Sequence, residues 1–297
     1  MYGNRPRKYA ALMTLATLAL SGCNSGSSSS TSSAGPTANS PGAGVGASSR
    51  QFGTPTRTQI RPGVEISSRN GSCTSNFLYA ENSVTVYIGV AAHCFSEDTN
   101  SGIDPCNTRN EAIGFAGITI ENASRPGTLA YSSWSAMQQR GETPGSDVCS
   151  LNDFALVQIH PDDLANIHPA AIGFGGPVAL FTGLAAVGDT VYSYGQSAAH
   201  GGVNDLEEKR GRITRIVGGG LGYRISTDSP GLPGDSGSAV LHQDGRALGV
   251  LSDVGVGIGL APVSNGVVNL ERALDYARRG GFISASTQLL TWDEFSP

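Results

Sequence analysis

The chain has 297 residues, of which 39% are hydrophobic and 14% charged, which is enough to bury a sizeable core in one or two domains. Its formal net charge is −5 and no cluster of lysine or arginine follows the first eight residues, so nucleic acid is not expected as a partner. The 41 glycines and 15 prolines, with little helical periodicity in the middle of the chain, indicate many short strands joined by turns.

The amino-terminal residues have the pattern of an export signal. A basic segment, residues 5–8, precedes an apolar stretch, residues 10–20, that is too short to span a bilayer as a mature helix. The run Leu20-Ser21-Gly22-Cys23 is similar to the lipobox of bacterial lipoproteins, which implies cleavage before Cys23 and a diacylglycerol group on its sulfur. We therefore expect residues 1–22 to be a lipoprotein signal peptide. An ordinary signal peptide with a chance cysteine is the alternative.

The residues after this signal differ in composition from the rest of the chain. Residues 23–52 are dominated by serine, glycine, alanine, threonine and proline, which cannot bury enough apolar surface to fold, so we expect a disordered tether. A folded domain is expected at residues 53–283 and a loosely packed tail at residues 284–297. A lipid on Cys23 would hold this domain at a membrane surface, and cleavage of the tether would release it as a secreted protein.

The five cysteines leave one unpaired, and Cys23 is the natural odd one. In an exported chain the other four are expected to form two disulfides, with three pairings possible; they are Cys73, Cys94, Cys106 and Cys149. A metal site is the rival interpretation, but the chain lacks the C-x-x-C spacing and the paired histidines that such a site would use.

The first half of the folded domain contains a histidine after a predicted buried strand. Residues 63–66 and 77–79 are predicted as short strands with a hairpin turn at residues 69–71, and residues 83–90 as a β-branched and aromatic strand. This strand leads into Ala91-Ala92-His93-Cys94, where two alanines leave room for the imidazole and the cysteine can fix the backbone behind it. His93 is therefore a candidate general base, although a histidine in such a place is often only structural.

Further strands are predicted at residues 112–121, and an acidic residue follows them in the middle of the chain. Asp153 opens the apolar stretch at residues 151–159, where an unpaired carboxylate would be costly. It is either an exposed strand end or a hydrogen-bonded functional acid.

The second half begins with a predicted strand at residues 187–195, and a hairpin at residues 212–226 turns at Gly218-Gly219-Gly220. Gly234-Asp235-Ser236-Gly237 then places a serine between two glycines, which is either a tight turn or an exposed nucleophile. Residues 267–279 have apolar side chains at helical spacing and end at two glycines, so a carboxy-terminal helix is expected there.

The motifs around His93, Asp153 and Ser236 occur in one of the three known chain orders of the serine-protease triad. With them, residues 57–280 resemble the chymotrypsin/trypsin-like serine proteases, and most of all their compact bacterial members. The resemblance implies an all-β fold of two six-stranded antiparallel β-barrels with a C-terminal α-helix. It also implies a serine endopeptidase that acts on protein or peptide substrates without a cofactor or metal, and we expect a monomer.

The resemblance assigns roles to individual residues. Ser236 would be the nucleophile, His93 the base and then the acid, and Asp153 the carboxylate that orients the imidazole. The backbone N–H groups of Gly234 and Ser236 would form the oxyanion hole. Gly234 is needed because its peptide must turn inward beside the substrate, a conformation that side chains resist.

The resemblance further selects the disulfide Cys73–Cys94, beside the histidine, and so leaves Cys106–Cys149. The segment 249–255 is similar to the strand that pairs with substrate, so the residues from Ser252 to Val254 would line the substrate edge, and Ser252 would contact the carboxylate of Asp153.

The specificity pocket departs from the trypsin-like subgroup. Pro230 stands where that subgroup carries an acid for basic side chains, so a preference for Arg or Lys is not expected. Asp228 is out of register, and Val254 would narrow the pocket toward small or medium apolar residues.

Two features separate this chain from the vertebrate zymogens. The segment 215–219 imitates their activation site, but it lies between Asp153 and Ser236, so we interpret it as a strand and turn and expect no activation by cleavage. Asp235 must then have another partner, which the sequence does not name. No function is assigned to the remaining histidines, which are His160, His168, His200 and His242. The alternative to an enzyme is an inactive protease-like domain that serves as a surface binding module.

Overall fold

The computed structural model describes residues 50–69, 71–98, 104–229, 231–255 and 264–297. They belong to one compact unit, Gly44–Pro297. The predictions for the signal peptide, Cys23, most of the tether and Pro230 lie outside these residues, as does the side chain of Val254. Among the described residues, no helix has the length and apolar character that a bilayer crossing requires.

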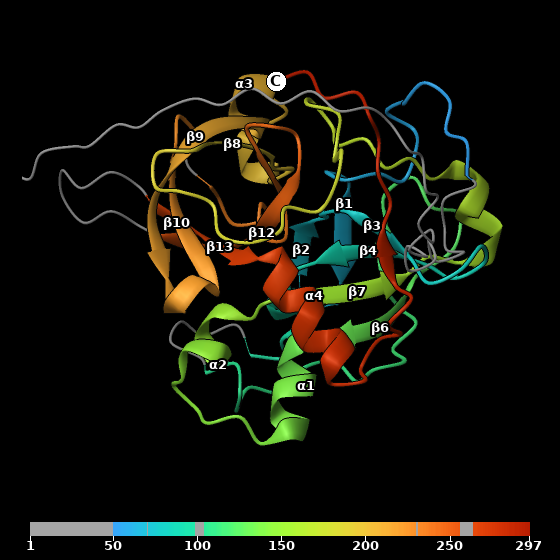
Figure 1. Ribbon diagram of the computed structural model, residues 1–297. Helices are drawn as coiled ribbons and strands as arrows, with labels where there is room; N and C mark the ends of the chain where they lie inside the picture. The colour runs from blue at the N-terminus through green and yellow to red at the C-terminus, as the bar shows by residue number, and fades with distance from the viewer. Residues whose placement is uncertain (1–49, 70, 99–103, 230, 256–263) are drawn as a thin grey trace, which may run out of the picture. The chain divides into compact units, whose positions relative to one another are not determined.

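The strands of the first half, together with one strand of the carboxy-terminal tail, form two antiparallel sheets (Figure 1). The three-stranded sheet has the order β2 (Gly71–Thr74), β1 (Glu65–Ser68), β5 (Thr119–Ile120). The five-stranded sheet has the order β14 (Gln288–Leu289), β3 (Leu78–Ala80), β4 (Val86–Val90), β7 (Ala155–Gln158), β6 (Thr128–Ser132).

The second half closes into a six-stranded antiparallel barrel. Its order is β10 (Gly222–Thr227), β13 (Ser264–Asn269), β12 (Ala247–Gly255), β11 (Ala239–His242), β8 (Thr190–Tyr194), β9 (Glu208–Val217). The segment 215–219 continues β9 into the turn before β10, which confirms its interpretation as a strand and turn.

The mostly β architecture and the C-terminal helix are as expected, but the first half differs from a closed ring of six strands. β2 and β5 have only four and two residues and each pairs with β1 alone, so their sheet does not join the five-stranded sheet through strand pairing. The second barrel closes because its long strands, such as the ten-residue β9, reach neighbours on both sides.

The helices are short and lie at the ends of strands. The α-helices are α1 (Ser133–Arg140), α2 (Asp147–Leu151), α3 (Asn204–Glu207) and α4 (Leu270–Arg279), and the 3₁₀ turns are η1 (Ala92–Phe95), η2 (Pro161–Asn166), η3 (Ala198–His200) and η4 (Gly218–Gly220). The predicted helix at residues 267–279 starts three residues later than expected, because Val267 and Val268 pair with strands in β13.

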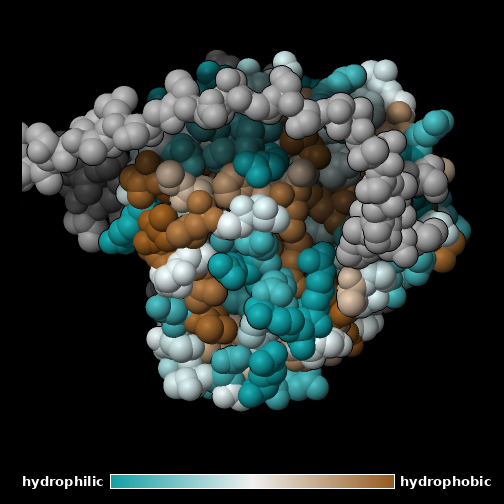
Figure 2. Space-filling model, in the orientation of Figure 1, coloured by the Kyte–Doolittle hydropathy of each residue, from teal (hydrophilic) through white to brown (hydrophobic). Residues whose placement is uncertain are grey.

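Helix α4 is amphipathic. Its apolar residues are buried at helical spacing against the barrel and α1, and they are Leu270, Ala273, Leu274 and Ala277. The side chain of Asn269 caps its first turn. Figure 2 shows the polar outer face of this helix, beside apolar side chains that gather over the β9–β10 hairpin and α2.

The carboxy-terminal tail is packed onto the domain, so the prediction of a loosely packed tail is wrong. β14 pairs with β3 of the first half, and Leu290 is 5% exposed. Further along, the N–H of Trp292 donates to the carbonyl of Pro177 at 2.9 Å, and the ring of Phe295 packs against Tyr192 of the barrel. The tail, red in Figure 1, therefore contacts both halves.

Candidate active site

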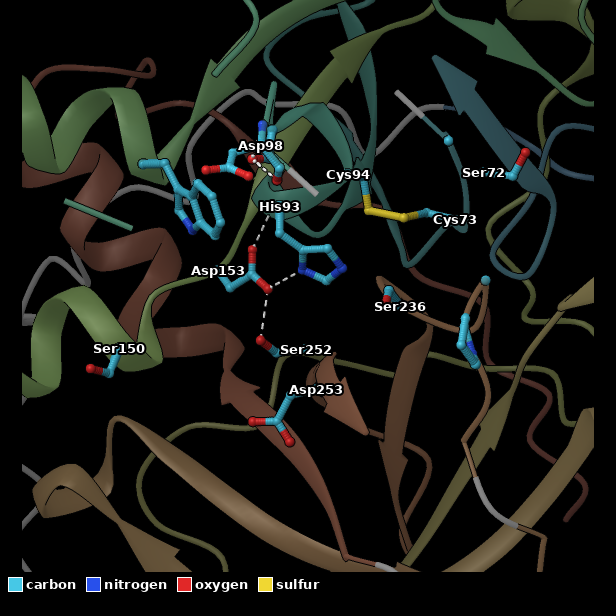
Figure 3. Close-up of a pocket in the computed structure, with 15 residues that line it drawn as sticks. Ser72, Cys73, His93, Cys94, Asp98, Ser150, Asp153, Ser236, Ser252 and Asp253 are labelled. Carbon is cyan, nitrogen blue, oxygen red and sulfur yellow. Dashed lines mark hydrogen bonds and ion pairs between the residues drawn. A yellow bond between two sulfur atoms is a disulfide. The ribbon is translucent and has the colours of Figure 1, made fainter. Parts of the chain in front are cut away.

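His93 and Asp153 meet at the ends of two paired strands of the first half. His93 lies in η1, directly after β4, and Asp153 precedes β7, which pairs with β4. The Asp153 carboxylate lies 2.6 Å from Nδ1 of His93 and accepts the backbone N–H of His93 at 2.8 Å (Figure 3). Ser252 from the barrel donates its hydroxyl to the same carboxylate at 2.7 Å, which confirms the predicted contact.

These contacts set the charges of the pair. Burial of the His93 ring acts to lower its pKa, but the charge and hydrogen bond of Asp153 outweigh this, so the pKa is raised above 6.5. For Asp153, burial acts to raise the pKa, and the contacts from His93 and Ser252 lower it overall. Asp153 is therefore held ionised and can orient the imidazole through Nδ1, which leaves Nε2 for a reacting group.

Ser236 lies on the side of the imidazole away from Asp153 (Figure 3). All three predicted triad residues line one cavity of about 450 Å³ between the two halves of the domain. Gly234 has φ +105°, and a Cβ there would lie 3.1 Å from the Cα of Ser197. The turn therefore requires glycine at this position, as the sequence predicts.

Two backbone donors face this cavity. Gly234 and Ser236 both line it, and among the described residues neither backbone N–H donates a hydrogen bond within the protein. Both residues are half-buried where they line the cavity, so these N–H groups are open to a ligand or water. Two such donors beside a serine hydroxyl suit a substrate oxygen that gains negative charge.

Asp235 turns away from the cavity and is fully buried. His200 places Nε2 at 2.9 Å from both carboxylate oxygens, and the Lys209 ammonium lies 3.2 Å from Oδ2. The backbone N–H groups of Ser197 and Leu232 also donate to this carboxylate. These residues are the partner that the sequence left unnamed.

His200 and Lys209 are buried with Asp235. Nε2 of His200 must carry a proton to donate to the carboxylate, and its Nδ1 has no hydrogen-bond partner among the residues described. Burial lowers the pKa of Lys209 below 10.5, against the opposing charge of Asp235. The alternation of side chains along β9 places Lys209 on its inner face. A lysine is rarely buried unless it is paired, so this position alone would not have predicted its burial.

Both expected disulfides are present. Cys73–Cys94 joins β2 to the residue after His93 with Cα atoms 6.2 Å apart, and Cys106–Cys149 joins a loop to α2 with Cα atoms 5.6 Å apart. The two groups of potential metal ligands within the described part of the chain each contain such a disulfide, whose sulfurs are not thiolates.

The cavity includes two residues that the sequence did not suggest, Trp134 of α1, which is buried against it, and Asp98. Asp253, which belongs to the predicted substrate strand at residues 249–255, also lines it. Asp253 is ion-paired with Arg224 at 2.5 Å. Asp228 instead accepts the backbone N–H of Arg210 in β9 and that of its neighbour Ser229, so its carboxylate stabilises the chain at the end of β10.

The comparisons with known proteins agree with this architecture. A family model described as a trypsin-like peptidase domain matches residues 74–250. The structure is similar to Thermobifida fusca protease A, with a TM-score of 0.50 and 19% identity over 78% of this chain and 99% of that one. It also matches Cellulomonas bogoriensis chymotrypsin, with a TM-score of 0.46 and 20% identity over 78% and 99% of the two chains.

The search of curated proteins finds no match. The family model nevertheless covers more than half of the chain, and it includes the segments of His93, Asp153 and Ser236. The chain therefore belongs to the trypsin-like peptidase family.

Proposed function

We propose that this protein is a serine endopeptidase that hydrolyses peptide bonds through His93, Asp153 and Ser236. The observation that carries the proposal is their arrangement around one cavity. An oriented imidazole lies between a buried carboxylate and a serine, and the backbone N–H groups of Gly234 and of Ser236 itself donate to no other residue that the structure describes.

The chemistry follows from this arrangement. Ser236 Oγ attacks the carbonyl carbon of the substrate while Nε2 of His93 takes its proton. The N–H groups of Gly234 and Ser236 stabilise the resulting oxyanion. The C–N bond then breaks, His93 returns the proton to the leaving amine, and an acyl-enzyme remains on Ser236. A water molecule then attacks the acyl carbon while His93 takes its proton. The bond to Ser236 Oγ breaks, His93 returns the proton to this oxygen, and the acid product is released.

The barrel offers an edge for the substrate backbone. β12 pairs with β11 only as far as Val250, whereas its pairing with β13 continues to Gly255. The strand from Ser252 onward is therefore unpaired with β11 and can accept an extended peptide as an added strand. We propose that this peptide carries a small or medium apolar residue before the cleaved bond, and a peptide library cleaved mainly after Arg or Lys would contradict that preference.

Hydrolysis of a peptide library, followed by mass spectrometry, tests the function. The wild-type protein should cleave internal bonds, and Ser236→Ala should lower kcat/KM by several orders of magnitude while remaining folded, because it removes the attacking oxygen. A folded wild-type protein that cleaves nothing would favour the inactive binding module.

We further propose that the protein is exported and held at a membrane by a lipid on Cys23. The basic and apolar amino-terminal pattern and the run Leu20-Ser21-Gly22-Cys23 support this proposal. The intact mass of the mature protein tests it. A chain beginning at Cys23 with added acyl mass is expected, and a chain beginning there without it would contradict the anchor.

A further inference from the structure

The position of each oxyanion-hole N–H depends on the carbonyl that precedes it. In a trans peptide unit the C=O and the following N–H lie in one plane and point in opposite directions. The partner of the Pro233 carbonyl therefore decides where the Gly234 N–H points. The partner of the Asp235 carbonyl does the same for Ser236.

The Pro233 carbonyl is held by a side chain outside the catalytic turn. The hydroxyl of Ser197 donates to this oxygen at 2.6 Å, and Ser197 is 3% exposed. Its Oγ already accepts the N–H of Ala199 at 3.1 Å, so its single proton is directed to Pro233. The Gly234 N–H must then point away from Ser197, and Gly234 lines the cavity.

The second peptide is held differently. The carbonyl of Asp235 accepts both the hydroxyl of Ser238 at 2.6 Å and the backbone N–H of Ser238 at 3.1 Å. Loss of the Ser238 hydroxyl would therefore leave one hydrogen bond in place. Among the residues described, the Pro233 carbonyl has Ser197 as its hydrogen-bond partner and no backbone donor.

The Pro233–Gly234 peptide is also the one most able to rotate. Glycine adopts positive and negative φ with similar ease, so the φ of +105° at Gly234 does not by itself fix the peptide plane. The segment that holds Ser197 also holds the partner of Asp235, because Ser197 precedes η3 and η3 ends at His200. Residues 197–200 thus contact both the carbonyl of Pro233 and the carboxylate of Asp235.

We propose that Ser197 is a positioning residue for catalysis: its hydroxyl keeps the Pro233–Gly234 peptide in the orientation that presents the Gly234 N–H to the oxyanion. The inference rests on the proposed peptidase function. It adds to the triad a residue that touches neither the substrate nor the reacting atoms. Its loss would leave Ser236 and His93 intact but let the donor peptide rotate away.

Steady-state kinetics of Ser197→Ala test the inference. We expect kcat to fall by about 10- to 100-fold with KM little changed, somewhat less than the 10²–10³ that loss of one oxyanion donor costs. Inhibition by a peptide aldehyde, whose adduct with Ser236 places an oxyanion in the hole, should weaken in proportion to kcat/KM. Ser238→Ala should lose clearly less activity, because its carbonyl keeps a backbone bond.

A control variant separates positioning from general loosening. Thr108 is buried and donates its hydroxyl to the carbonyl of Asp104 at 2.8 Å, outside the residues that line the cavity. Thr108→Val should keep kcat and KM. If Ser197→Ala instead raises KM alone, or keeps full activity, the inference is overturned.

A structural measurement tests the inference without activity. A high-resolution crystal structure of Ser197→Ala should show the Pro233–Gly234 peptide rotated or in two orientations. An unchanged single orientation would overturn the role of the hydroxyl even if the enzyme were slow. A wild-type protein that cleaves no peptide, with the peptide rotated in Ser197→Ala, would instead count against the proposed peptidase function alone.

Discussion

His93 lies among carboxylates that decide the pH at which it can act as a base. Asp153 is the main group that raises its pKa above 6.5, and Asp253 of the substrate cavity adds to the effect. A general base must be unprotonated, so activity is present above this raised pKa and is lost as the pH falls through it. The acid limb of the kcat/KM profile should therefore lie above pH 6.5.

The substitution Asp253→Asn tests that electrostatic account. It removes a negative charge near the ring and should lower the pKa of His93, so that the acid limb moves to lower pH. Asp244→Asn is a matched control, since Asp244 is also paired with an arginine but lies outside the cavity. Equal profiles for Asp253→Asn and the wild type would show that Asp253 does not act on His93.

Lys209 supplies positive charge to a fully buried carboxylate. Breaking a buried pair by removing one partner leaves the other charge uncompensated and costs about 3–5 kcal/mol. Lys209→Met should therefore lower the free energy of unfolding by this amount and reduce kcat, because Asp235 adjoins Ser236. Lys209→Arg, which keeps the charge, should lose less, and denaturant unfolding with kinetics checks both. If Lys209→Met is as stable as the wild type, then His200 and the backbone N–H groups are enough to compensate the buried charge of Asp235.

The three triad residues could be predicted from the sequence, but the residues that hold the turn around Ser236 in place could not. His93, Asp153 and Ser236 are recognisable because each sits in a short local motif. Apart from the neighbouring N–H of Leu232, the partners of Asp235 are Ser197, His200 and Lys209, which lie 26 to 38 residues away with no local pattern that links them to the turn. Ser197 in particular looks like an ordinary loop serine, because its role depends on the direction of one peptide plane.

The elements that hold the site are mostly turns and short strands. The β-branched and aromatic residues of β4 make it predictable as a strand, whereas η3 has only three residues and is bounded by nothing more than a serine and a glycine. The predicted helix began too early because periodicity alone does not distinguish a short apolar run such as Val267-Val268 in a buried strand from the start of a helix. The packing of the tail was not predicted because its few apolar residues, among them Trp292 and Phe295, follow neither helical nor strand periodicity.

The packed tail should contribute to stability. Phe295 packs on Tyr192, and its ring fills the space above Gly245. Fully burying such a side chain is worth about 1.5–3 kcal/mol, and Phe295 is half-buried, so Phe295→Ala should lower the free energy of unfolding by about 1–2 kcal/mol. Removal of residues 284–297 should cost more, because the pairing of β14 with β3 is lost as well.

Thermal unfolding measures both changes. Leu184→Ala is a control, since Leu184 is an apolar side chain 52% exposed and should change stability by less than about 0.5 kcal/mol. A truncated protein as stable as the wild type would show that the tail contacts add nothing.

At the scale of the whole molecule, the site exists only where the two halves meet. His93 and Asp153 come from the first half, while Ser236 and Ser252 come from the barrel. The halves are also tied beneath the turn, since Thr74 donates its hydroxyl to the carbonyl of Gly234 at 2.7 Å and its N–H to that of Ser236 at 2.9 Å. Sequence motifs identified the two halves and their order. The hydrogen bonds between Thr74 and the turn around Ser236 depend on how the halves pack together, which no local sequence pattern indicates.

The most direct test of the proposed catalytic site is covalent labelling of the purified protein with a fluorophosphonate, which reacts much faster with an activated serine than with an ordinary one. The labelled peptide would be located by mass spectrometry, with Ser236→Ala and Ser197→Ala treated in parallel. We expect one adduct, on Ser236, absent in Ser236→Ala and formed more slowly in Ser197→Ala. A folded wild-type protein without an adduct, or with its adduct on another serine, would contradict the proposed catalytic site.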